Sequence, residues 1–255
     1  MTGLTGTTGT SMRRAALIAG LSLLLMSVLA GLANFGVLQR LVSESDETRT
    51  TSTLLEALGS FRLAIVALFL VAALDVVVAW ALWIFFDRVH HGLAVLAACC
   101  RGLYAAIFAV AILHLVAAAR LLGDSPSHGR IDTRVTGQVL AEIQRFEDLW
   151  SLALGLFGVH LLLVGWLAFT SGFVPRVIGV LVVIAGAGYL ADCLGDLLSA
   201  RYAIEVASFT FVGEVGLMGW LLVFAARSRF QSNDQQLTAV SDATTIRSSG
   251  PRSRS

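Results

Sequence analysis

Four ionisable residues stand inside long apolar runs of this sequence, where a charge is costly. They are Asp75, Arg101, His160 and Glu214. A carboxylate at the centre of a membrane-spanning helix costs roughly 2.5–3.5 kcal/mol, so such a group normally faces a partner, water or a ligand. Together these four side chain types can pair as ions, supply a histidine base, or hold a cation or an amine.

The chain that positions these residues has the composition of a helical membrane protein. Apolar residues make up 56% and charged residues 14% of its 255 positions, whereas soluble domains carry about 25% charged residues. Apolar runs of at least about 18 residues recur, and each can cross a hydrocarbon core of roughly 30 Å as a helix. The net charge of +1 produces no field that would attract nucleic acid. We therefore predict an all-α membrane protein.

The apolar runs predict a six-transmembrane-helix bundle with both termini on the same side of the membrane. We expect a flexible N-terminal lead at 1–12, a transmembrane domain at 13–226 and a disordered tail at 227–255. Thr53 and Glu56 form a capping box near the start of the second span. The predicted spans are about 15–38, 54–86, 93–122, 149–170, 174–198 and 204–226.

The connection before the fourth span carries apolar residues at helical spacing, among them Val139, Ile143 and Phe146. This pattern predicts an amphipathic helix that lies at the membrane surface. Arginine is slightly more frequent on the side of the termini, a bias that favours cytoplasmic termini in the plasma membrane.

Depth along the predicted spans brings the four intramembrane residues to one layer. At a rise of 1.5 Å per residue, Asp75, Arg101, His160 and Glu214 lie about 16, 14, 15 and 18 Å from the side of the termini. Asp75 is therefore expected to pair with Arg101 on the next helix. Asp192 lies about 10 Å further out. We predict one polar ligand-binding pocket lined by these five residues and open to the opposite face.

A second polar layer, nearer the face opposite the termini, consists of Arg62, His114 and Asp196. Long polar side chains near helix ends reach water easily, so we interpret this outer layer as structural. The inner layer has a structural alternative as well, because Arg–Asp pairs inside a helical bundle can serve only to fix the packing of the helices.

No sequence motif identifies a catalytic centre. HExxH, Gly-x-Ser-x-Gly and a P-loop are absent from the sequence. GAGYLA in the fifth span fits a dinucleotide fingerprint by letter, but no strand surrounds it, and small residues at this density favour close helix packing. Cys99, Cys100 and Cys193 form neither a metal-binding pattern nor a disulfide framework. We expect neither a metal nor a cofactor.

Long stretches of the spans follow one another in a distinctive order. They are FRLAIVALFLVAALDVVVAWALW, LAVLAACCRGLYAAIFAVAILHL and LGLFGVHLLLVGWLAFTSGFVPRVIGVLVVIAGAGYLAD, before a last span led by Glu214. In this order and spacing the chain resembles an uncharacterised bacterial membrane family, domain-of-unknown-function family 4386, over about residues 14–226. The resemblance implies a multi-pass membrane protein with no established activity. It points to Arg62, Asp75, Arg101, His160, Pro175, Tyr189, Asp192 and Glu214.

The sequence leaves three functions open. The favoured hypothesis is a multi-pass membrane protein whose polar pocket binds or carries a small polar or amphiphilic ligand, with the lipid bilayer as its other partner. One alternative is a structural or regulatory membrane subunit whose buried charges only hold the bundle together. The other is an intramembrane enzyme that uses His160 with Asp192 or Glu214, which the absence of a catalytic motif disfavours.

Overall fold

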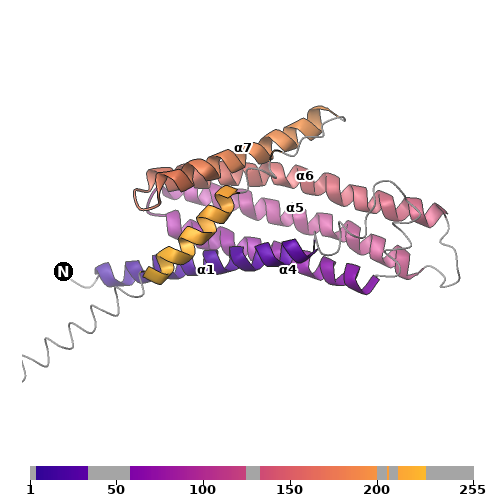
Figure 1. Cartoon of the computed structure of the whole chain (residues 1–255), viewed down its shortest axis with the longest axis horizontal. Helices are drawn as coiled ribbons and strands as arrows, with labels where there is room; N and C mark the ends of the chain where they lie inside the picture. The colour runs from indigo at the N-terminus through magenta and orange to yellow at the C-terminus, as the bar shows by residue number, and fades with distance from the viewer. Residues whose placement is uncertain (1–3, 34–57, 125–132, 200–205, 207–211, 228–255) are drawn as a thin grey trace, which may run out of the picture.

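The computed structural model describes residues 4–33, 58–124, 133–199, 206 and 212–227, with the backbone alone for 4–10. Within these ranges every regular element is a helix and none is a strand, as predicted (Figure 1). The elements are α1 (Leu4–Ala33), α4 (Leu58–Phe86), α5 (His91–Gly123), α6 (Thr133–Thr170), α7 (Arg176–Leu198) and a last helix at 212–227.

The outward faces of the helices are apolar. Leu63, Leu113 and Val177 have exposed fractions of 69%, 62% and 69%, and so large an exposed apolar surface is typical of contact with lipid rather than water. Helices α1 and α4–α7 are long and apolar enough to cross a membrane. The last helix is shorter in the part of the chain that the structure describes, so a sixth crossing stays a prediction.

Consecutive helices pack as neighbours, with α1 on α4, α4 on α5, α5 on α6 and α6 on α7. The turn after α4 is closed by a 2.9 Å hydrogen bond from the Val89 amide to the Phe86 carbonyl. Between α6 and α7, Gly172 adopts a φ of 74°, a conformation that disfavours residues with a Cβ. Short turns make the joined helices antiparallel neighbours, and residues at matching depths can therefore meet.

Helices α6 and α7 approach so closely that their backbones touch at glycines. A Cβ on Gly186 would lie 2.7 Å from the Gly158 carbonyl oxygen, and one on Gly179 would lie 2.9 Å from the Gly165 carbonyl oxygen. Small residues allow such contact between helices in lipid. The structure thus bears out the interpretation of GAGYLA as a packing surface, because Gly186 belongs to that stretch.

The last helix crosses the bundle obliquely from α7 toward α1 (Figure 1). At its start, a Cβ on Gly213 would meet the Leu181 carbonyl oxygen, so this end packs on α7. Near its end, Leu222 packs against Gly20 and Arg13 Nε donates a 3.3 Å hydrogen bond to the Ala225 carbonyl. The last helix therefore begins on α7 and ends beside the first half of α1.

The fourth predicted span differs from the structure in its start. Residues 133–170 form one helix, α6, so the segment assigned to the membrane surface is the first part of α6. Val139, Ile143 and Phe146 are buried there, and the Phe146 ring lies 6.4 Å from that of Phe108 in α5. Periodicity indicates that one face is covered, but it does not distinguish a covering of lipid from a covering of protein.

Helix α1 begins before the predicted first span. Helix α1 starts at Leu4, within the predicted lead 1–12, and its part long and apolar enough to cross a membrane is Ser11–Ala33. Once a helix exists, each added residue gains a hydrogen bond at little further cost, so the helix extends beyond its apolar run. Residues 34–38 of that predicted span, the capping box at 53–56 and the tail from 228 lie outside the described residues.

Candidate functional site

Asp75 in α4 and Arg101 in α5 form an ion pair in the interior of the bundle. Arg101 Nη2 lies 2.7 Å from Asp75 Oδ1, and the exposed fractions of the two residues are 2% and 0%. The short turn between α4 and α5 brings the two mid-helix positions to the same depth. The predicted pairing is thus present.

His160 joins α6 to this pair. Its Nδ1 lies 2.8 Å from the Ala97 carbonyl oxygen, and its Nε2 lies 3.2 Å from Arg101 Nη1. A carbonyl oxygen only accepts and a guanidinium only donates. His160 Nδ1 therefore carries the hydrogen, Nε2 accepts from Arg101, and the imidazole is neutral. This network of Asp75, Arg101 and His160, the buried triad, links α4, α5 and α6.

The Phe157 ring of α6 packs against two members of the triad. The Arg101 guanidinium carbon lies 5.1 Å from the centre of the Phe157 ring, and the His160 ring stacks on the same ring with centres 5.8 Å apart. Phe157 was not singled out from the sequence, although it precedes His160 by three residues and so shares its helix face. The Ala97 carbonyl had no sequence signal, because every residue carries one.

Glu214 in the last helix belongs to the electrostatic surroundings of the triad. Its carboxylate interacts with the Tyr189 hydroxyl of α7 and with the charges of Arg101 and Asp75. Tyr189 in turn packs edge-on against Phe157, with ring centres 5.3 Å apart. Asp75, Arg101 and His160 are thus in direct contact, and Glu214 interacts electrostatically with the charges of Arg101 and Asp75.

Asp75 Oδ1 is engaged by the ion pair with Arg101. Apart from that atom, three buried polar atoms of this region have no hydrogen-bond partner within the described residues: Asp75 Oδ2, Arg101 Nε and Glu214 Oε1. An unsatisfied polar group in a membrane interior costs several kcal/mol. Two of the three atoms are carboxylate oxygens, so the region favours a guest that donates hydrogen bonds or carries positive charge.

Asp192 has a contact of another kind. Its Oδ1 accepts a 2.9 Å hydrogen bond from the backbone amide of Val206, in the connection between α7 and the last helix. This bond ties the connection to α7. A pocket shared by all five predicted residues therefore stays a prediction.

The residues of the predicted outer layer do not form one cluster, because they contact different partners. His114 Nδ1 lies 2.6 Å from Glu142 Oε2, which joins α5 to α6, and Glu142 also pairs with Arg145. Asp196 Oδ2 accepts a 2.6 Å hydrogen bond from the Ser151 hydroxyl, which joins α7 to α6. The α6 partners of the outer layer lie on the segment that was assigned to the membrane surface or at its end.

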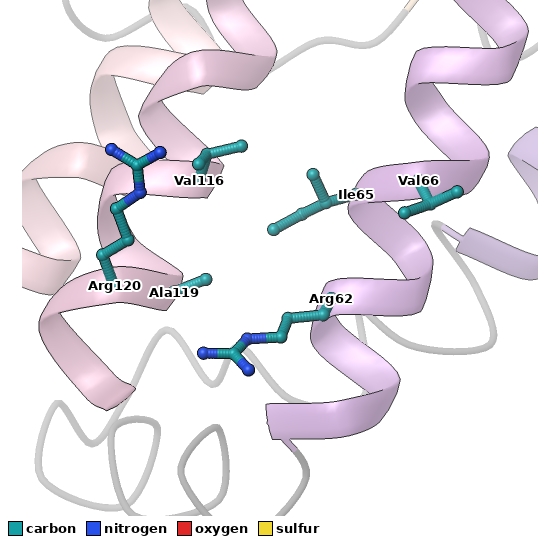
Figure 2. A pocket seen from close by; sticks show the side chains of 6 residues that line it. All are labelled: Arg62, Ile65, Val66, Val116, Ala119 and Arg120. Atoms are coloured by element: carbon teal, nitrogen blue, oxygen red, sulfur yellow. The ribbon is translucent and has the colours of Figure 1, made fainter. Parts of the chain in front are cut away.

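Two surface hollows lie away from the triad. One, of about 480 Å³, runs between α6 and α7 and includes Ser151, Cys193 and Asp196. The other, of about 320 Å³, lies between α4 and α5 and includes Arg62 and Arg120 (Figure 2). Neither is lined by a residue of the triad or by Glu214. Within the described ranges no three metal-binding side chains gather.

The family and the relative that match this chain have no assigned activity. Residues 18–225 match the family described as a domain of unknown function (DUF4386). An uncharacterised protein of Archaeoglobus fulgidus is 32% identical over 160 residues, or 63% of this chain and 82% of that protein. No solved structure matches the chain. The chain belongs to the DUF4386 family, which its sequence resembles from the first span to the last helix.

Proposed function

We propose that this protein is a multi-pass plasma-membrane protein that binds or carries a small polar or amphiphilic ligand at the buried triad and Glu214. The observation that carries the proposal is the pair of unsatisfied carboxylate oxygens, Asp75 Oδ2 and Glu214 Oε1, inside the bundle. A ligand with a positively charged, hydrogen-donating group would supply the hydrogen bonds that both oxygens lack.

The charges of the region support the same ligand class. The charge of Arg101 offsets that of the Asp75 carboxylate, and His160 is neutral because its Nε2 accepts from Arg101 and only Nδ1 carries a hydrogen. An ionised Glu214 leaves one negative charge in excess. A buried charge without a partner is costly, so an amine, a metal cation or a proton would stabilise the region.

Both termini are proposed to face the cytoplasm. Support comes from the bond between Arg13 and the Ala225 carbonyl, which holds the first part of α1 beside the end of the last helix. Arginines near these ends, among them Arg14 and Arg227, fit the excess of positive charge on the cytoplasmic side. Reporter domains fused to the two ends are expected to be protected from an external protease; opposite sides would contradict the proposal.

A structural or regulatory subunit is the second candidate. The link from Asp75 through Arg101 and His160 to the Ala97 carbonyl joins three helices without any ligand. The enzyme alternative has less support, because the lone pair of His160 Nε2 accepts from Arg101 and is not free to take a proton.

The test is ligand binding by the purified full chain in lipid nanodiscs. A series of alkylammonium ions from methylammonium to hexylammonium is titrated, and stabilisation against thermal unfolding is measured. We expect the stabilisation to depend on Glu214, so Glu214→Gln removes it. Asp148→Asn is the matched control, because it removes an exposed carboxylate of α6. Equal thermal stabilisation of the wild type and Glu214→Gln would contradict ligand binding at Glu214 and favour the structural or regulatory subunit.

A further inference from the structure

The hollow between α4 and α5 lies where α4 begins and α5 ends, away from the buried triad. It has a volume of about 320 Å³ and is lined by Arg62, Ile65, Val66, Val116, Ala119 and Arg120 (Figure 2). Four of the six residues are apolar, and the other two are arginines. The hollow therefore joins an apolar wall to a strongly basic rim.

Both arginines of the hollow present their guanidinium groups at the surface. Arg62 and Arg120 are exposed, and neither takes part in an ion pair within the described part of the chain. Figure 2 shows Arg62 extending from α4 toward α5, and Arg120 lying beside Val116 on α5. Arg62 Nη2 would lie 3.0 Å from a Cβ on Gly123, so its side chain crosses the gap between the two helices.

The apolar wall continues into the lipid-facing surface. Val66 is 53% exposed, and Phe69, one turn further along α4, is 58% exposed. On α5, Val116 leads toward Leu113, which is 62% exposed. An occupant of this hollow therefore meets one guanidinium group from each helix and a continuous apolar surface beside them.

We infer that the hollow binds one anionic phospholipid, with its phosphate between Arg62 and Arg120 and an acyl chain along Val66 and Val116. Guanidinium groups match phosphate oxygens with paired hydrogen bonds, and Arg62 and Arg120 can approach one phosphate from two helices. A free phosphate would leave the apolar wall uncovered. A zwitterionic lipid brings a positive group to a rim that is already positive.

The inference is tested with the full chain in detergent by native mass spectrometry. Dioleoyl-phosphatidylglycerol, dioleoyl-phosphatidylcholine and sn-glycerol 3-phosphate are titrated separately, and the first bound molecule is quantified. Each arginine near a membrane surface contributes about fivefold in affinity for an anionic lipid. We expect Arg62→Gln and Arg120→Gln each to weaken phosphatidylglycerol binding by about that factor, and the double variant to lose the preference over phosphatidylcholine.

Two controls separate this site from general charge attraction. Arg88→Gln removes the same charge from the exposed turn after α4, at the other end of that helix, and is expected to keep the preference. Val116→Phe fills the wall while both charges remain, and is expected to weaken phosphatidylglycerol binding. A preference that survives in the double arginine variant, or that Arg88→Gln abolishes as well, would overturn the inference. So would displacement of the lipid by millimolar sn-glycerol 3-phosphate, or full binding by Val116→Phe.

Discussion

The buried triad and the arginine hollow use the same side chain in opposite ways. Arg101 is 2% exposed and donates to Asp75 and His160, whereas Arg62 is exposed and has no ion pair in the described ranges. The inner arginine is held by protein on three helices, so its loss changes the packing. The outer arginine is near water and lipid, so its loss changes what binds. Depth and partners therefore decide what a charge does in this protein.

The largest effect is expected from Asp75→Asn. The substitution removes the charge that compensates a buried guanidinium, and breaking a buried pair in this way costs about 3–5 kcal/mol. The free energy of unfolding, measured in mixed micelles by titration with a denaturing detergent, should fall by this amount. A second substitution, Arg101→Met, should recover part of the loss because the stranded charge is removed with it. A purely additive double variant would contradict the pairing.

A smaller loss is expected from His160→Leu. This change removes the acceptor of Arg101 Nη1 and the donor to the Ala97 carbonyl, and an unsatisfied buried group costs about 1–3 kcal/mol. The same unfolding titration measures it. His114→Leu is the matched control, since its partner Glu142 also has Arg145, and should cost less. Equal losses of unfolding free energy in the two variants would mean that burial does not strengthen the contribution of His160 to stability.

The smallest effect on stability is expected from Arg62→Gln. An exposed side chain without an ion pair contributes within about 0.5 kcal/mol, so the unfolding titration should give a value close to that of the wild type. The same variant is expected to lose phosphatidylglycerol affinity, and this separation of binding from stability sharpens the contrast with Arg101. A large loss of stability in lipid-free micelles would mean that Arg62, like the triad, stabilises the fold.

Much of the inner site was predictable because helices convert sequence distance into depth. Asp75, Arg101 and His160 lie on three helices joined in series, and a fixed rise per residue placed them in one layer. The same rise per residue placed Glu214 in that layer. The contact of Asp192 was not predictable, since its hydrogen bond to Val206 depends on where a residue outside the helix lies, and depth along a helix carries no information about that.

The extent of α6 was less predictable for a different reason. Val139, Ile143 and Phe146 mark a covered helix face, but lipid, a membrane surface and a neighbouring helix all select apolar residues. Only the contact between Phe146 and Phe108 identifies α5 as the cover. The arginine hollow was missed in the same way, because Arg62 and Arg120 are far apart in sequence and meet only where α4 and α5 lie side by side.

The sequence by itself determined that the chain is an apolar helical protein, which residues are costly in lipid, and at what depth each stands. Composition and helix geometry are local properties, and they follow from residue type and spacing alone. Tertiary structure decided which partners those residues have: Ala97 for His160, Val206 for Asp192 and a shared hollow for Arg62 and Arg120. Rotation of each helix about its axis selects these partners, and that rotation is set by packing such as the glycine contacts of α6 and α7.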